Sequence, residues 1–430
     1  MIARYSTQDT ETLKTALLSR NQFDFKDINA AVTQIIDAVK QEGDHALIEY
    51  AKQFDGVVLT TLKVPEETLK AAYEALPETL LKAFTKAKDN LTRYHEQQRD
   101  TSFIDEEEGI IRAQRVTPID RVGLYIPGGS AAYPSSVLMN VIPAQIAGVK
   151  QLVMVTPPQK NGVNPTILAL AYWLGIDEVY QVGGAQAIAA LAYGTQTIPK
   201  VDKVVGPGNI YVATAKKQLL GTIGIDSFAG PSEVIILADR TTKASYVAAD
   251  MIAQAEHDAL ASAITFSTDE SFLDEVEKEL LRQVPLRDRQ NVIEASLKAY
   301  GALVHVNDFK EAIEWVNVLA PEHLQLMYED AERDVERIRN AGAIFIGSYT
   351  PEAVGDYIGG TNHTLPTSST ARFASGLSTY DFCKRTSVLK YDVNALERVI
   401  DDIDAMAKEE GLDGHAYSAT IRKDDPLDQT

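Results

Sequence analysis

The feature that most constrains the fold is a repeated strand, loop and helix pattern between residues 121 and 240. Short apolar runs such as VGLYI, LVMVT and VIILAD alternate with segments of helical periodicity such as NPTILALAYWLG. This interval is typical of βαβ units around a parallel sheet. Crossovers in such sheets are right-handed, and ligands bind at the carboxyl ends of the strands, so we expect a binding site there.

A second αβ pattern follows between about residues 241 and 350. Expected helices over 243–260, 308–319 and 329–340 alternate with extended runs such as SAITFST and AGAIFIG. We therefore predict an α/β chain with two Rossmann-like domains, each an incomplete parallel-sheet unit. A small N-terminal helical segment and a C-terminal extension complete this prediction.

The flanking regions read differently. Residues 27–54 and 65–97 carry helical spacing, and residues 109–126 alternate as extended segments do. Residues 350–390 are rich in Gly, Ser, Thr and Pro, which is typical of a long functional loop region. One amphipathic helix is expected over 394–409.

Charge and cysteine content exclude several function classes. The formal net charge of −20 argues against a nucleic-acid partner, because such binders usually carry a basic face. The N-terminal stretch lacks the apolar core of a signal peptide, and no apolar run is long enough to span a bilayer. We therefore expect a cytoplasmic protein. Cys383 is the single cysteine, so any metal site must use nitrogen and oxygen ligands. Cys383 itself we expect to be buried packing.

Glycines cluster in three loops that follow expected strands. They are IPGGS (126–130), VGGAQA (182–187) and VGPGN (205–209). Glycine lets backbone N–H groups approach an anion at a helix N-terminus, although a tight βα turn explains any one loop equally well. Three such loops on one sheet edge favour a nucleotide site. No acidic residue that would read a ribose is identifiable, so the pattern does not distinguish NAD from NADP.

Two pairs of residues could carry chemistry. Gln254 and His257 are three apart on an expected helix, which places two metal ligands on one face, although a surface or core role is the commoner reason for such a pair. Glu322 and His323 are adjacent and could supply two proton-transfer groups. The alternative for Glu322 is a helix start after Pro321, which the spacing alone favours.

The remaining candidates lie in the polar loop and the tail. Asp356 and His363 stand among glycines in VGDYIGGTNH, a composition that indicates a metal or substrate loop. Glu410 and His415 follow the expected C-terminal helix and could reach a partner subunit. The other three histidines are expected to be structural: His45, His95 and His305.

Taken together, these motifs resemble the histidinol dehydrogenase family. The matching segments are VGLYIPGG, GGAQAIAALAYGT, VVGPGN, AGPSEVIILAD, QAEHD, APEHL, GDYIGGTNHTLPT and GLDGHA. They occur in the family's order, and with the N-terminal helices they cover essentially the whole chain. The resemblance implies a two-step, NAD-linked oxidation of L-histidinol through L-histidinal to L-histidine.

The resemblance also implies a ligand set and a partner. One zinc ion per subunit is expected on Gln254, His257, Asp356 and His415, with His415 and Glu410 serving the site of the other subunit in a homodimer. Nitrogen and oxygen ligands alone do not separate zinc from manganese. The implied domains are residues 1–20 (N-terminal extension), 21–120 with 236–376 (acid–base and metal residues), 121–235 (NAD binding) and 377–430 (C-terminal extension).

Roles for the other residues follow from the same resemblance. His323 is expected to take the alcohol proton, Glu322 to activate the water that hydrates the aldehyde, and NAD to contact Tyr125, Gln186 and Asn209. The substrate is expected to contact eight side chains: Ser232, Gln254, His257, His323, Asp356, His363, Glu410 and His415.

Three alternatives remain open. The first is a related zinc and NAD dehydrogenase of another small alcohol, against which the match of the tail argues. The second is a dimeric metal-binding protein without turnover, which binding of zinc but not NAD would support. The third is a Rossmann oxidoreductase without metal, which conflicts with the four-ligand set and lacks the usual fingerprint.

Overall fold

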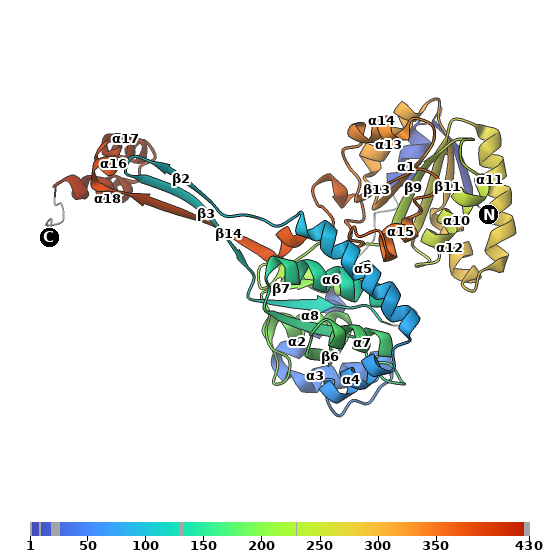
Figure 1. The fold of residues 1–430 in the computed structure, drawn as a ribbon, viewed down its shortest axis with the longest axis horizontal. Helices are drawn as coiled ribbons and strands as arrows, with labels where there is room; N and C mark the ends of the chain where they lie inside the picture. Colours follow the sequence, from blue (N-terminus) through green and yellow to red (C-terminus); the bar gives the residue numbers. More distant parts are fainter. Residues whose placement is uncertain (1, 8–9, 19–25, 129–132, 229, 425–430) are drawn as a thin grey trace. The chain divides into compact units, whose positions relative to one another are not determined.

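The chain has an α/β fold, as predicted, with two separate parallel sheets (Figure 1). A computed structural model describes residues 2–7, 10–18, 26–128, 133–228 and 230–424. Within it the chain divides into two compact units, the first formed by residues up to Gln98 with Ile119–Phe382, the second by Arg99–Pro118 with the chain from Cys383 onward. Both parallel sheets belong to the first unit.

The smaller parallel sheet is built from the first strand–helix series. Its strand order is β6-β5-β4-β7-β8, so the order reverses between β4 and β7. Such a reversal opens a crevice for ligands at the carboxyl ends of these two strands. The strands are β4 (Arg121–Tyr125), β5 (Gln151–Thr156), β6 (Glu178–Gln181), β7 (Lys203–Val205) and β8 (Gly224–Ile225).

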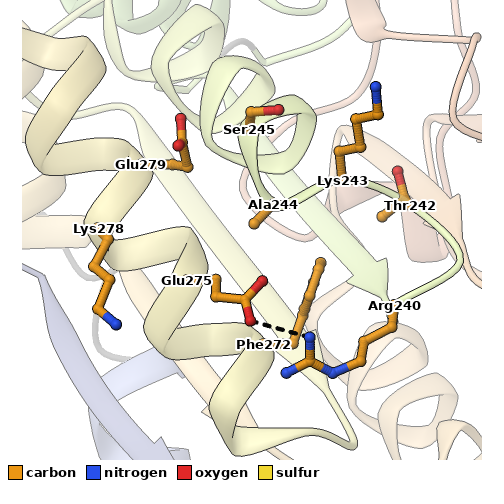
Figure 2. A pocket seen from close by; sticks show the side chains of 9 residues that line it. All are labelled: Arg240, Thr242, Lys243, Ala244, Ser245, Phe272, Glu275, Lys278 and Glu279. Atoms are coloured by element: carbon orange, nitrogen blue, oxygen red, sulfur yellow. Dashed lines mark hydrogen bonds and ion pairs between the residues drawn. The ribbon is translucent and has the colours of Figure 1, made fainter.

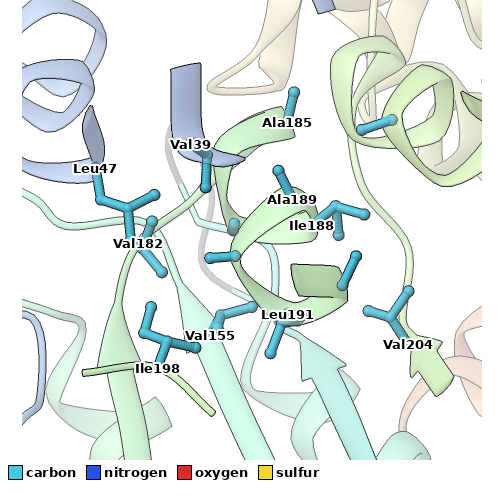
Figure 3. Close-up of a cluster of buried hydrophobic side chains, with 14 of the residues drawn as sticks. Val39, Leu47, Val155, Val182, Ala185, Ile188, Ala189, Leu191, Ile198 and Val204 are labelled. Carbon is cyan, nitrogen blue, oxygen red and sulfur yellow. The ribbon is translucent and has the colours of Figure 1, made fainter. Parts of the chain in front are cut away.

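Two layers of helices cover this sheet, one on each face. One buried cluster joins α2, α3, α8 and α9 to the sheet, and Figure 3 shows Val39 and Leu47 beside Val182 within it. A second cluster joins α4, α5, α6 and α7. The bounds are α2 (Lys26–Glu42), α3 (Asp44–Tyr50), α4 (Glu66–Glu74), α5 (Glu78–Glu96), α6 (Pro134–Ala147), α7 (Pro165–Trp173), α8 (Gly184–Tyr193) and α9 (Ile210–Leu219).

The larger parallel sheet has the order β1-β11-β10-β9-β12-β13. Helices α10, α11 and α12 bury one face, and α1 and α13 bury the other. The strands are β1 (Ala3–Ser6), β9 (Glu233–Ala238), β10 (Ser262–Ser267), β11 (Ala302–His305), β12 (His323–Met327) and β13 (Ala343–Ile346). The helices are α1 (Thr10–Leu18), α10 (Ala244–Ala255), α11 (Glu270–Gln283), α12 (Gln290–Tyr300), α13 (Phe309–Leu319), α14 (Ala331–Asp334) and α15 (Glu352–Tyr357).

The second unit is an antiparallel ribbon followed by short helices. Its strands are β2 (Phe103–Glu107), β3 (Ile110–Pro118) and β14 (Cys383–Tyr391), in the order β14-β3-β2. Its helices are α16 (Val393–Glu397), α17 (Ile400–Glu409) and α18 (Asp413–Asp424). Several large apolar side chains of the ribbon are exposed: Phe103, Ile104, Val388 and Leu389.

Some expected elements differ from those observed. Helix α10 ends at Ala255, so His257 lies beyond the helix and not on it. Residues 329–340 form only the short α14 and a 3₁₀ turn, and residues 394–409 are split between α16 and α17. Glu322 does not start a helix, because the chain enters strand β12 at His323. Cys383 is only half-buried.

The predicted division grouped residues 21–120 with residues 236–376. In the structure the side chains of α2 to α5 share buried clusters with the sheet of residues 121–225. The exact domain boundaries stay a prediction. No helix in the described part of the chain is long and apolar enough to cross a membrane.

Candidate functional site

The predicted acid–base pair lies at the amino end of strand β12, beside the amino end of β9, in the larger sheet. His323 is the first residue of β12 and pairs in register with Val234 of β9. Glu322 immediately precedes it, after Ala320 has turned the chain in a left-handed conformation with φ 48°. A Cβ on Gly342 would lie 2.5 Å from the Glu322 carbonyl oxygen, so this close approach requires glycine.

One backbone residue holds both members of the pair. The Glu233 N–H donates to Glu322 Oε2 at 3.0 Å, and the Glu233 carbonyl lies 3.1 Å from His323 Nδ1. Glu322 Oε2 and His323 Nδ1 are 3.6 Å apart. A backbone carbonyl can only accept, so the neutral His323 ring carries its proton on Nδ1.

That proton position leaves His323 Nε2 with a free lone pair. Nε2 is buried and has no hydrogen-bond partner among the described residues, while Asp356 Oδ1 is 4.0 Å away. Burial lowers the pKa of His323 to about 3, and the neighbouring His257 and His363 act in the same direction. The ring is therefore neutral at physiological pH and presents a proton acceptor to the site.

Glu322 lies in a different electrostatic environment from an exposed carboxylate. Burial raises its pKa well above the ordinary value, and the charges of Glu233 and Asp356 add to this effect. The Ser232 hydroxyl hydrogen-bonds to the same carboxyl and opposes the shift. A carboxyl with a raised pKa can accept and return a proton near neutral pH.

A group of potential metal ligands lies beside this pair. One ligand atom each from His257, Glu352 and Asp356 falls within 4.8 Å of the others. Burial raises the pKa of Asp356 to about 7 and that of Glu352 well above its usual range. Neither carboxylate forms an ion pair with a Lys or Arg side chain in the part of the chain that the structure describes. Two carboxylates without a Lys or Arg partner and a half-buried imidazole fit a divalent cation bound by nitrogen and oxygen.

Gln254 is fully buried next to this group, on the last turn of α10. In the orientation that satisfies its hydrogen bonds, the amide nitrogen donates to Glu352 Oε2 at 3.0 Å and to the Glu233 carbonyl at 3.3 Å. The His257 backbone N–H donates to the Gln254 backbone carbonyl, with the nitrogen 3.3 Å from the oxygen. The end of α10 thus brings both predicted ligands to the amino edge of the sheet.

His363 connects this site to helix α6. Its Nδ1 lies 3.0 Å from the Asp356 carbonyl oxygen and its Nε2 lies 3.2 Å from Ser136 Oγ. Burial lowers the pKa of His363 to about 4. The residue is therefore neutral and already bonded through both ring nitrogens.

The predicted cofactor residues lie at the carboxyl edge of the smaller sheet. Tyr125 ends β4, and its hydroxyl accepts from the Gly184 N–H at 3.1 Å. Gly184 has φ 65°, and a Cβ there would meet Gln186 Oε1 at 2.6 Å. These contacts place Tyr125 and Gln186 around one glycine turn. Of the first glycine loop, residues 129 and 130 lie outside the described part of the chain.

The third glycine loop is fixed from behind by a buried ion pair. Lys216 Nζ donates to the Gly206 carbonyl at 2.5 Å and to Asp226 Oδ1 at 2.7 Å, while the Gly206 N–H donates to Asp226 Oδ2 at 2.8 Å. The side chains of the pair are only 2% and 5% exposed. Asn209 in this loop caps α9 by accepting from the N–H groups of Tyr211 and Val212. Its side-chain oxygen is therefore engaged, and its amide nitrogen faces no described partner.

Glu410 and His415 belong to the second unit. Glu410 follows the last residue of α17, and His415 lies on α18. Both side chains are exposed. They are therefore accessible on this unit, and the other predicted site residues all belong to the first unit.

Three polar residues near the site were not predicted from the sequence. Glu352 is buried at the start of α15. The Gln325 side-chain amide bridges Glu352 and Asp250: its oxygen accepts from the Glu352 backbone N–H at 2.9 Å, and its nitrogen donates to Asp250 Oδ2 at 2.9 Å. Burial raises the pKa of Asp250 to about 7. The only available indication was the Pro351–Glu352 helix start, which is too common to mark a site.

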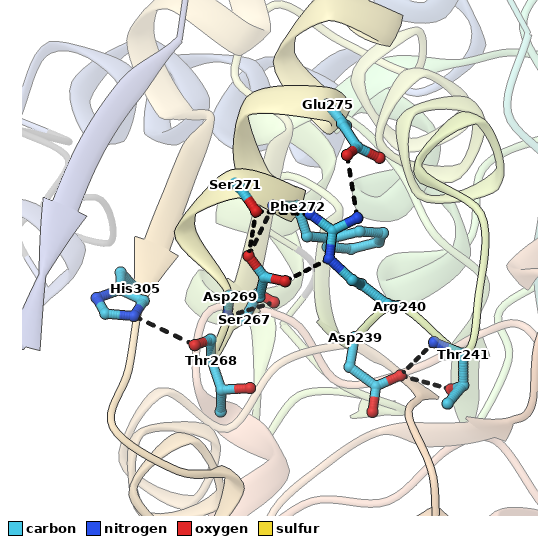
Figure 4. A network of polar contacts seen from close by, with 10 residues as sticks. All are labelled: Asp239, Arg240, Thr241, Ser267, Thr268, Asp269, Ser271, Phe272, Glu275 and His305. Carbon is cyan, nitrogen blue, oxygen red and sulfur yellow. Dashed lines mark hydrogen bonds and ion pairs between the residues drawn. The ribbon is translucent and has the colours of Figure 1, made fainter.

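The carboxyl edge of the larger sheet carries none of the predicted residues. Three sets of polar contacts lie there: Arg240 pairs with Asp269, Asp239 accepts from Thr241, and His305 contacts the Thr268 carbonyl (Figure 4). A surface hollow beside it is lined by Arg240 and Glu275, which form an ion pair (Figure 2). Their charges are mutually neutralised, so we assign this edge a structural role.

Comparisons with known proteins all point in one direction. The sequence model described as histidinol dehydrogenase matches residues 18–423. The chain is 46% identical to a histidinol dehydrogenase of Listeria innocua, over 97% of this chain and 98% of that protein. It is 48% identical to one of Streptococcus mutans, over 93% of each. A crystal structure of histidinol dehydrogenase from Elizabethkingia anophelis matches with a TM-score of 0.92 and 36% identity, over 98% of both chains.

Proposed function

Because this chain belongs to the histidinol dehydrogenase family, we propose that it oxidises L-histidinol through L-histidinal to L-histidine in two NAD-linked steps. The observation that carries this proposal is the buried, unpartnered Nε2 of His323 between Glu322 and the potential metal ligands. An alcohol bound there meets a proton acceptor and an acid–base carboxyl together.

His323 accepts the hydroxyl proton from the substrate in the first step, as the carbinol hydride passes to NAD. The aldehyde then adds water: Glu322 takes a proton from that water, and the protonated His323 gives its proton to the carbonyl oxygen, which becomes a hydroxyl. His323 accepts the proton of the resulting hydrate as a second hydride leaves. Each step yields one NADH and one proton. The hydrogen bond from Nδ1 to the Glu233 carbonyl keeps Nε2 directed at the substrate.

One divalent metal ion, zinc in our proposal, orients the substrate's imidazole and amine when it is bound. Gln254, His257 and Asp356 of one subunit would hold it with His415 of the partner subunit. The cluster of His257, Glu352 and Asp356 supports this position. Glu352 adds negative charge beside the ion and receives a hydrogen bond from Gln254.

The cofactor is NAD, bound over the carboxyl edge of the smaller sheet by Tyr125, Gln186 and Asn209. The reversal of strand order between β4 and β7 and the glycine turns at Gly184 and Gly206 support this placement.

The working enzyme is a homodimer in which Glu410 and His415 complete the partner's site, and Ser232 and His363 complete the substrate contacts. The exposed apolar side chains of the ribbon support a surface that another chain covers. A three-stranded ribbon that exposes Phe103, Ile104 and Leu389 gains stability when that surface is buried.

The test is NADH formation with L-histidinol on zinc-loaded and chelator-stripped protein. We expect two NADH for each histidinol, loss of turnover on chelation and recovery on addition of zinc. If NADH formed only with another amino alcohol, that alcohol would replace L-histidinol as the proposed substrate. Zinc binding without NAD binding would contradict it.

A further inference from the structure

A half-buried carboxylate near the proposed cofactor site has one inaccessible oxygen without a hydrogen-bond partner among the described residues. Asp55 ends a π-helical turn (Ala51–Asp55) that continues α3, and Gly56 then adopts a left-handed conformation with φ 66°. Asp55 Oδ2 is inaccessible to solvent and has no hydrogen-bond partner among the described residues. π-Helical turns occur frequently at functional sites.

Its neighbours locate Asp55 at the carboxyl edge of the smaller sheet. The charge of Asp55 acts on the hydroxyl of Tyr125, which ends β4 and accepts from Gly184 after β6. A Cβ on Gly56 would lie 3.9 Å from Cε of Lys160, in the loop after β5. Ala51 packs in the same cluster as Tyr125 and Ala185. Asp55 thus lies beside the proposed cofactor turn.

This carboxylate destabilises the protein on its own. Burial raises its pKa from 3.8 to about 6, so a folded chain above that pH holds a poorly solvated charge. Folding favours the protonated group, and this stabilisation is lost as the pH rises through about 6. A carboxylate that costs stability persists where a ligand supplies its missing donors.

We propose that Asp55 binds a ribose of the dinucleotide, with its carboxylate accepting hydrogen bonds from the vicinal hydroxyls. A ribose diol offers two neighbouring O–H donors, which match the two oxygens of a carboxylate. Acidic side chains read ribose hydroxyls in this way in other dinucleotide sites. The inference rests on the proposed use of NAD.

The experiment compares Asp55→Asn with wild type and with Glu49→Gln, which removes an exposed carboxylate from α3 in the same segment. Dissociation constants for NAD and NADP are measured by calorimetry, and thermal stability is measured at pH 5 and pH 8. We expect Asp55→Asn to weaken NAD binding about tenfold or more. It should also raise the unfolding temperature more at pH 8 than at pH 5, because the cost of holding the carboxyl in the folded chain grows between the unfolded pKa of 3.8 and the folded pKa of about 6. Glu49→Gln should change neither.

The two cofactors identify the ribose. A smaller preference for NAD over NADP in Asp55→Asn assigns Asp55 to the adenosine ribose, since NADP carries its phosphate there. An unchanged preference with weaker NAD binding assigns it to the nicotinamide ribose. Unchanged NAD affinity in an Asp55→Asn variant that is more stable than wild type overturns the inference. Weaker NAD binding in an Asp55→Asn variant that is less stable than wild type also overturns it, because the loss then reflects a damaged fold. If wild type binds no NAD, the proposed function fails instead.

Discussion

At His323, a single hydrogen bond decides which ring nitrogen can react. The Glu233 carbonyl fixes the proton on Nδ1, and burial keeps the ring neutral. Nε2 is then the acceptor whatever the pH of the cell. The same backbone residue also donates to Glu322, so one strand start positions both proton-transfer groups.

We predict that His323→Asn lowers turnover of L-histidinol by about 10²- to 10⁴-fold, because proton abstraction is lost. Metal binding should be retained, since the ligand cluster is intact. His305→Asn is the matched control, because the His305 side chain contacts the Thr268 carbonyl on the opposite edge of the same sheet. Initial rates of NADH formation and zinc content measure both. Equal rates in wild type and His323→Asn would remove His323 from the mechanism.

Metal affinity should depend on pH through Asp356. Its carboxyl has a pKa of about 7 without metal, so protons compete with the ion below that pH. We expect zinc to bind at least roughly tenfold more weakly at about pH 6 than at about pH 8. The neutral His257, whose pKa burial lowers, adds no proton competition in this range. Competition with a fluorescent chelator at both pH values measures the change, and equal affinities would exclude Asp356 as a ligand.

At the scale of elements, the turns after the strands of the smaller sheet carry the proposed cofactor site, and buried contacts hold these turns. A Cβ on Gly206 would lie 2.1 Å from the Tyr125 carbonyl oxygen, and φ is 110° there. The turn after β7 therefore fits against the end of β4 only with glycine. The Lys216–Asp226 pair then bonds the same turn through both its N–H and its carbonyl.

We predict that Lys216→Met lowers the free energy of unfolding by about 3 kcal/mol or more, because Asp226 is left buried without its partner. NAD binding should weaken as well, since the turn loses its support. The control is Glu178→Gln, which breaks a pair with Arg121 at the amino ends of β4 and β6. That pair is about a quarter exposed, and its loss should cost about 1 kcal/mol or less. Urea denaturation measures the free energy of unfolding of each variant, and titration with NAD measures its affinity. Equal losses in the two variants would contradict a stabilising role of the Lys216–Asp226 pair at this turn.

At the scale of the whole molecule, the predicted site residues are divided between the two units. Glu410 and His415 lie on a unit with its own ribbon and helices, whereas the ligand cluster lies in the other unit. If the tail serves a partner, two defective subunits can complement each other.

Co-expression of His323→Asn and His415→Ala subunits provides the test. Each variant alone should be inactive. In a hybrid dimer, one site would combine an intact His323 with the partner's intact His415, so a random mixture should show about a quarter of wild-type activity. Activity of purified hybrid dimers at the level of the separate variants would show that each His415 serves its own subunit.

Much of the fold could be predicted because periodicity is local. The alternation over residues 121–240 predicted β4, β5, β6 and β7 and the helices between them, since burial on both faces requires continuous apolar strands. The last run of this series, VIILAD, is instead β9 of the larger sheet, and the two-residue strand β8 was not predicted. Propensity failed where tertiary contacts decide: Glu322 looks like a helix start after proline, yet pairing with β9 makes the next residues a strand.

The sequence by itself determined the parallel sheets, the glycine turns and the residue types available for proton transfer and metal binding. Only the tertiary structure brought Glu352 to Asp356 and His257, and left His323 Nε2 and Asp55 Oδ2 without hydrogen-bond partners among the described residues. These properties depend on burial and on contacts between residues far apart in the chain. Spacing along the sequence does not contain that information, because desolvation and hydrogen bonding are set by which distant backbone and side chains close around each group.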